Sequence, residues 1–164
     1  MPYATITQLI EAYGHAEVAE LLCDEEQLVT ETTLQAKVDD DLTGLSPEEQ
    51  TAINAAWARG ENILARQSVF IDSKIGIRYT LPLGNPSATP VVECCLALSR
   101  AALADDGDNI STTIKEERKH WRAWLNDVGN GSALLTGETQ GSVGGTVNGH
   151  HCTAIPSAVD WDSY

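Results

Sequence analysis

The spacing of apolar residues predicts helices through most of the chain. A short helix is expected to begin after Thr5, whose hydroxyl can cap it while Gln8 reaches back to the same residue, and to end at Gly14. A second short amphipathic helix is expected over 16–23, because its apolar residues fall on one side. The chain therefore opens with two short helices.

An acidic stretch then breaks the helical period. Residues 24–46 are expected to form a loop with one weak turn of helix around 34–38. The clearest helix start follows, since Ser46 can cap a helix and Pro47 fits the first turn, where a missing N–H costs nothing. Apolar residues then recur every three or four positions, which predicts one long helix running to about Tyr79.

Gly60 lies inside this long helix and has two interpretations. It is either a weak point that costs about 1 kcal/mol relative to alanine, or a place where another helix comes close. The prolines and glycines of 82–90 stop the helix. Residues 91–104 are apolar on nearly every side, which is typical of a helix at the centre of a bundle.

The last predicted helix begins at Ser111 and ends at Gly129 and Gly131 by glycine C-cap chemistry. The residues beyond it are rich in glycine and carry no helical period. The sequence therefore predicts an all-α fold, a small helical bundle with one long helix (1–129), followed by an extended Gly-rich C-terminal arm (130–164).

Charge divides the chain into an acidic front, a mixed middle and a nearly uncharged end. The 24 Asp and Glu against 10 Lys and Arg give a formal net charge of −14 at pH 7, which argues against a basic nucleic-acid binder. Residues 24–49 hold nine acids and one base, Lys37. Three of these acids are consecutive: Asp39, Asp40 and Asp41.

Four bases share one face of the last helix at spacings i, i+3, i+4 and i+7: Lys115, Arg118, Lys119 and Arg122. Like charges at these spacings repel by about 0.2–0.5 kcal/mol per pair, so acid from outside makes the stripe better tolerated. That acid could come from the acidic segment of the same chain, from a neighbouring copy or from nucleic-acid phosphate. The alternative is an ordinary solvated face helped by Glu116 and Glu117.

The residues assemble no catalytic constellation, so we expect no enzyme, cofactor or metal site. No histidine stands in a nucleophile motif, and the glycines of 141–145 lack the Lys-Ser/Thr of a phosphate loop. The adjacent residues 150–152, His-His-Cys, cannot enclose a tetrahedral ion unaided. Cys94 and Cys95 lie in an apolar helix, where thiols behave as small hydrophobes. Neither a signal peptide nor a membrane span is expected.

The end of the arm carries apolar and aromatic side chains beyond a glycine-rich stretch, which favours an anchor that docks on a partner. The residues expected to dock are Ile155, Val159, Trp161 and Tyr164.

Three passages together resemble the Mu-like phage gp36 family of head-tail connector or head-completion (adaptor) proteins. The first is Met-Pro-Tyr-Ala-Thr at 1–5, leading into a short helix that ends Ala-Tyr-Gly. The second is Ile-Arg-Tyr-Thr-Leu-Pro-Leu at 77–83, after the long helix, and the third is Trp-Leu-Asn-Asp-Val at 124–128, followed by a glycine. The resemblance covers about residues 1–135. The acidic run at 39–41 and the long Gly-rich arm depart from the family pattern.

The resemblance implies a structural protein that assembles as a dodecameric ring between the portal vertex of a tailed-phage capsid and the tail. Its partners would be itself, the portal protein and a downstream neck or tail-completion protein, while packaged DNA passes through without sequence-specific binding. The protein would be made in the host cytoplasm and end in the virion neck. The alternative, from another class, is a DNA-packaging or regulatory nucleic-acid-binding factor that uses the basic stripe of the last helix.

In such a ring the charge pattern acquires a role. The basic stripe of one copy would meet the acidic run 39–41 of the next, so these two sets of residues are the expected subunit interface. An acidic lumen would repel DNA phosphate and let the duplex slide. The arm would dock on the portal or on a neighbouring copy.

Overall fold

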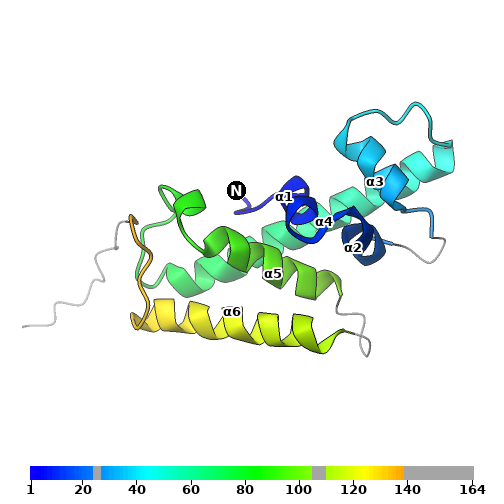
Figure 1. Cartoon of the computed structure of the whole chain (residues 1–164). Helices are drawn as coiled ribbons and strands as arrows, with labels where there is room; N and C mark the ends of the chain where they lie inside the picture. Colours follow the sequence, from blue (N-terminus) through cyan, green and yellow to red (C-terminus); the bar gives the residue numbers. More distant parts are fainter. Residues whose placement is uncertain (24–26, 105–109, 139–164) are drawn as a thin grey trace, which may run out of the picture.

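A computed structural model of the chain describes residues 1–23, 27–104 and 110–138. The elements in chain order are α1 (Ile6–Tyr13), α2 (His15–Leu21), α3 (Glu31–Val38), α4 (Pro47–Ile75), the 3₁₀ turn η1 (Pro86–Ala88), α5 (Val91–Leu103) and α6 (Thr112–Asn130), shown in Figure 1. The described ranges contain no β-strand. The prediction of a helical fold with one long helix is confirmed.

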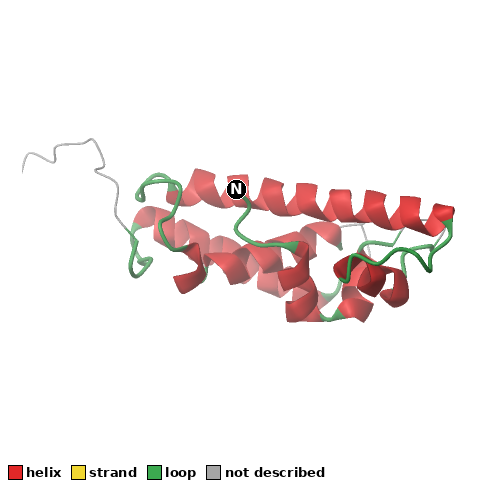
Figure 2. Ribbon diagram, turned by 90° about the horizontal axis from the view of Figure 1, so that it is seen from above, coloured by secondary structure: helices red, strands yellow, loops and turns green. Residues whose placement is uncertain are grey.

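α4 is the spine of the molecule and runs along nearly the whole helical body (Figure 2). Its 29 residues span about 44 Å at 1.5 Å per residue. The predicted start is confirmed, because Ser46 and Glu49 form a complete capping box. The helix ends at Ile75 rather than near Tyr79. The chain turns at Gly76, and the side chain of Tyr79 becomes buried against the segment that follows α6.

α4, α5 and α6 form a three-helix bundle over the second half of α4, in which each helix packs on the other two (Figure 1). Eight of the 13 residues of α5 are buried, which confirms the central position predicted from its apolar sequence. α6 approaches α4 tightly at Gly129, where an added Cβ would lie 3.0 Å from the carbonyl oxygen of Lys74. The helix continues through Gly129 and stops before Gly131, whose φ of 81° suits glycine.

α1, α2 and α3 cover the first half of α4 (Figure 1). The predicted cap of α1 is confirmed, because Thr5 and Gln8 form the capping box. α1 packs directly on Gly60, where an added Cβ would lie 3.0 Å from Cδ1 of Ile6 and 3.4 Å from Cδ2 of Leu22. Gly60 is therefore the site of a close approach between helices.

The acidic segment is more helical than predicted. In place of a single weak turn near 34–38, α3 forms two turns. The hydroxyl of Thr30 accepts a hydrogen bond from the N–H of Thr33 at 3.2 Å, and Leu34 is completely buried. A cap and one apolar anchor hold this helix, and the periodicity of apolar residues, which needs several, does not detect it.

Arg100 joins four helices at the end of the bundle where α6 begins. It lies on α5, and its Nε and Nη1 donate to Glu17 of α2 at 2.5 Å and to Glu117 of α6 at 3.0 Å. Its guanidinium carbon lies 4.4 Å from the ring centroid of Tyr13 in α1. Burial opposes the positive charge, but the hydrogen bonds to Glu17 and Glu117 raise the pKa of Arg100. This cluster fixes α6 against α1 and α2.

The close approach at Gly60 gives a stability prediction. Gly60→Val places two methyl groups in the contact with Ile6 and forces α1 away from α4, so we expect a loss of about 1–3 kcal/mol of unfolding free energy. Ala55→Val, on the exposed side of α4, is the control and carries only the helix-propensity cost of about 0.6 kcal/mol. Chemical denaturation followed by circular dichroism measures both. Equal stability of the two variants would contradict the packing described.

The Arg100 cluster gives a prediction at alkaline pH. Burial, with the charge of Glu117, raises the pKa of Tyr13 to about 12, against about 10 for an exposed tyrosine. The folded state favours the neutral phenol, so its contribution is complete below pH 10 and is lost as pH rises toward 12. The unfolding free energy should therefore fall more steeply between these values in the natural protein than in Tyr13→Phe, which keeps the ring beside Arg100. Parallel curves would show that Tyr13 is not protected from ionisation.

Candidate functional site

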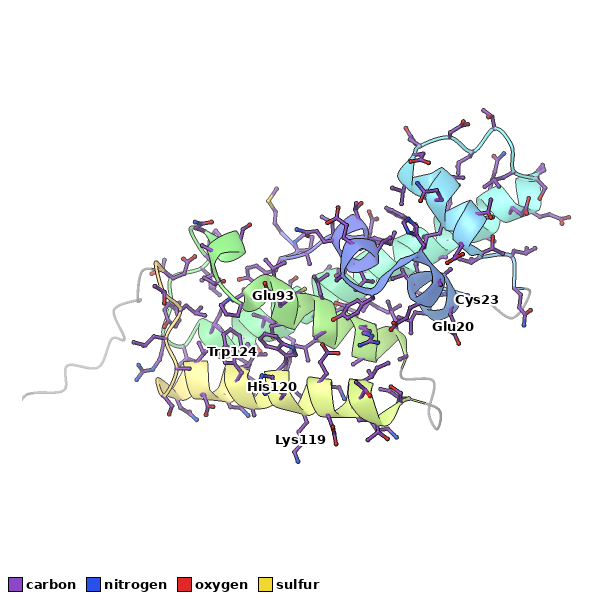
Figure 3. All side chains as sticks on the ribbon, viewed as in Figure 1. Glu20, Cys23, Glu93, Lys119, His120 and Trp124 are labelled. Carbon is purple, nitrogen blue, oxygen red and sulfur yellow. The ribbon has the colours of Figure 1, made fainter. Side chains whose placement is uncertain are left out.

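The basic stripe predicted from the sequence is an outward-facing surface of α6. Lys115, Lys119 and Arg122 are exposed and Arg118 is half-buried. All four line a shallow hollow of about 420 Å³, together with Ala123 and Asn126. Figure 3 shows Lys119 pointing away from the bundle. The helical spacing therefore brings these four side chains together on one face.

α4 adds a fifth cation to this face. Two basic groups stand over the ring of Phe70, with Nζ of Lys74 at 5.7 Å and the guanidinium carbon of Arg122 at 5.5 Å from its centroid. Val69, beside Phe70 in the chain, is 67% exposed. Lys74 is not part of the stripe predicted from the sequence, although its place one turn after Phe70 was a usable signal. We call this set the basic surface: Lys74, Lys115, Arg118, Lys119 and Arg122.

Carboxylates gather at the opposite end of α4. We call this set the acidic tip: Glu31, Asp39, Asp40, Asp41, Glu48 and Glu49. Glu31, Asp39 and Asp41 line a hollow of about 570 Å³ on α3, together with His15. Hydrogen bonds from the hydroxyl and the N–H of Thr43 lower the pKa of Asp41, and those from Ser46 lower the pKa of Glu49. Asp41 and Glu49 therefore keep their negative charge to lower pH than ordinary carboxylates do.

The two charged surfaces lie apart on α4. The acidic tip belongs to the first half, where Lys37 of α3 donates to Asn54 at 2.8 Å. The basic surface belongs to the second half, beside Phe70 and Lys74 (Figure 1). Among the described residues, no carboxylate lies within 4.0 Å of the Lys115 or Lys119 ammonium or the Arg122 guanidinium. The described acidic tip of the same chain is thus not the acid that meets this surface.

The root of the C-terminal arm is tied to the bundle. The hydroxyl of the buried Tyr79 accepts a hydrogen bond from the N–H of Leu135 at 2.8 Å. The carboxylate of Glu138 accepts two more, from the N–H groups of Gly84 and Asn85, each at 2.8 Å. The first residues of the arm therefore pack on the α4–α5 connection. The proposed docking residues, Ile155, Val159, Trp161 and Tyr164, lie outside the described residues.

The described residues contain no group of three side chains that could hold a metal ion. The His-His-Cys passage at 150–152 and the glycines of 141–145 lie outside them. Burial raises the pKa of the Cys94 and Cys95 thiols, which keeps them in the unreactive thiol form. No helix among the described residues is long and apolar enough to cross a membrane.

The three passages that carry the resemblance all bind the second half of α4 or the segments that follow it. The N–H of Tyr3 donates to Oγ of Ser68 at 2.9 Å, and its hydroxyl donates to Asp72. Tyr79 receives the arm at Leu135. The carbonyl of Asp127 accepts from two N–H groups just after α6. The passages thus join the chain start, the α4–α5 connection and the end of α6 into one unit.

A comparison with known families places this unit. The family model described as Bacteriophage Mu, Gp36 matches residues 3–150. The matched range includes the six α-helices of the described residues, the acidic tip, the basic surface and the root of the arm. A comparison with curated proteins gives no match. Because the family match spans most of the chain, the protein belongs to the bacteriophage Mu Gp36 family and is a phage structural protein.

Proposed function

We propose that this protein is a head-tail connector subunit that assembles as a dodecameric ring between the portal and the tail of a tailed phage. Membership of the Gp36 family supports a role in the virion. The observation that carries the proposal is the separation of the acidic tip and the basic surface along α4, because Lys115, Lys119 and Arg122 form no ion pair with a carboxylate among the described residues.

Two complementary surfaces at different places on one subunit favour a head-to-tail contact. If the basic surface of one copy receives the acidic tip of the next, the same contact repeats at every step, and a fixed rotation closes a ring. The hollow on α3, lined by carboxylates, and the hollow on α6, lined by cations, provide the matching chemistry. Complementary charge sets the register of such an interface more than its affinity.

Ring closure also sets the electrostatic field that DNA meets in the lumen of the ring. The basic surface holds five of the ten Lys and Arg of the chain. If these five cations are paired with a neighbour at the interface, the surfaces left exposed are strongly acidic, because the net charge of the protein is already −14. Such a lumen repels DNA phosphate, so the duplex passes without sequence-specific binding.

In this proposal the ring lies in the virion neck. Its partners are the portal protein on one side and a downstream neck or tail-completion protein on the other. The arm, with Trp161 and Tyr164 near its end, docks on the portal or on a neighbouring copy, because an arm that orders on binding can bury much surface from a small domain.

The alternative is a DNA-packaging or regulatory factor that binds nucleic acid through the basic surface. The addition of Lys74 to the stripe favours it, because five cations on one face fit a phosphate backbone. It requires DNA binding that weakens steeply with salt. The net charge of −14 opposes it, since the rest of the molecule repels the duplex.

Charge reversal tests the interface. Lys115→Glu/Lys119→Glu/Arg122→Glu should prevent assembly on purified portal, and so should Asp39→Lys/Asp40→Lys/Asp41→Lys, because each places like charges face to face. A chain with both sets should regain assembly. Glu11→Lys, on an exposed position of α1, is the control and should assemble normally. Sedimentation velocity measures the complexes.

Assembly of both single sets would show that these surfaces do not meet. Failure of the combined chain to recover would show the same. A basic-surface variant that assembles normally but loses salt-dependent DNA binding would favour the alternative function.

Truncation tests the arm. A chain that stops after Glu138 keeps the hydrogen bonds to Gly84 and Asn85, so its melting temperature should match that of the full chain. Its association with portal should weaken, because the docking residues are gone. Trp161→Ala/Tyr164→Ala in the full chain is the finer test of the same anchor. Unchanged particle assembly by the truncated chain would refute the docking role.

A further inference from the structure

The arm leaves the bundle at the same end as one edge of the basic surface. Glu138, the last described residue, is held on Gly84 and Asn85 beyond the end of α4. Lys74 lies in the last turn of α4, where Gly129 of α6 approaches its carbonyl. Figure 1 shows the end of α6, the end of α4 and the root of the arm together at one end of the molecule. Whatever follows Glu138 therefore starts close to the basic surface.

The chain after Glu138 has chemistry that complements this surface. Residues 139–164 contain no Lys or Arg, and their only charged side chains are Asp160 and Asp162. These two carboxylates flank Trp161, and Tyr164 follows two residues later. The segment thus offers two negative charges around an aromatic side chain.

The basic surface offers the matching groups. Lys74 and Arg122 stand over the ring of Phe70. A guanidinium or ammonium group already held beside an aromatic ring gains further from a second ring that stacks on it. Lys115 and Lys119 are exposed farther along α6 and are available to carboxylates.

The length of the chain allows the contact within one subunit. Trp161 follows Glu138 by 23 residues, which span at most about 83 Å when fully extended. The basic surface occupies α6, whose 19 residues are about 28 Å long. Every part of the surface is within reach of the arm of the same copy.

We propose that in the free subunit the segment 155–164 covers the basic surface of its own chain. Asp160 and Asp162 pair with lysines of α6, and Trp161 stacks beside Arg122 and Phe70. The inference rests on the proposed function, because it places the arm on the same surface that a neighbour's acidic tip uses in the ring. A tethered segment acts at an effective concentration up to the millimolar range, so it prevails over the tip of a free neighbour in dilute solution.

The contact would regulate assembly. When the portal holds subunits side by side, the neighbour's acidic tip gains the same advantage of proximity and displaces the arm. Ring closure then releases Trp161 and Tyr164 to dock on the next partner. The arm thereby couples interface formation to partner binding, and free subunits are kept from closing rings before they reach a portal.

Photo-crosslinking tests the proposal in the full chain without portal. Trp161 is replaced by p-benzoylphenylalanine, and isotopically light and heavy copies are mixed before irradiation. We expect crosslinks to α6 or to the second half of α4 within single copies. Asp160→Asn/Asp162→Asn should lower their yield roughly tenfold. Glu11→Gln/Glu20→Gln, on exposed positions of α1 and α2 outside both charged surfaces, makes the same charge change and should leave the yield unchanged.

Crosslinks that join light and heavy copies, or that fall on other helices, would overturn the proposal. A yield insensitive to the removal of Asp160 and Asp162 would overturn it as well. Failure of the proposed function is distinguishable, because rings formed on portal without intrachain crosslinks refute only the covering by the arm. Intrachain crosslinks without rings refute the connector role.

Discussion

The packing of the other helices on α4 is the constraint on which the rest of the structure depends. α4 is longer than the helices beside it, so α1, α2 and α3 cover its first half while α5 and α6 cover its second half. The close approach at Gly60 seats α1, and the approach of Gly129 to Lys74 seats α6. Because the two halves are covered by different helices, the acidic tip and the basic surface are held apart.

Two kinds of basic group follow from this arrangement. Arg100 is enclosed where four helices meet and is paired with Glu17 and Glu117 inside the subunit, so it contributes to the fold. The exposed cations of α6 face outward. Lys74 and Arg122 lie against the ring of Phe70 and form no ion pair with a carboxylate in the described ranges. Arg100, which is enclosed and paired, thus stabilises the subunit, whereas the exposed cations are available to a neighbour or to the arm.

Local signals predicted most of the fold. The caps at Thr5 and Ser46, the all-round apolar sequence of α5 and the glycines after α6 are short-range features that set helix starts, burial and ends. The full length of α3 was not predicted, because a helix held by one buried leucine and a threonine cap shows no apolar period in the sequence.

The contacts that were missed join residues far apart in the sequence. The place of Lys74 in the basic surface, the cluster around Arg100 and the bond from Leu135 to Tyr79 depend on how helices cross. A single sequence shows which residue types are available for such long-range contacts, but it does not show which residues meet. The stripe on α6 was predictable because it lies within a single helix.

The measurement that tests the central claim most directly is the mass of the complex formed with purified portal protein, determined by native mass spectrometry. The account predicts a closed ring of twelve copies bound to the portal. A protein that stays monomeric beside the portal and never comigrates with it would contradict the connector role.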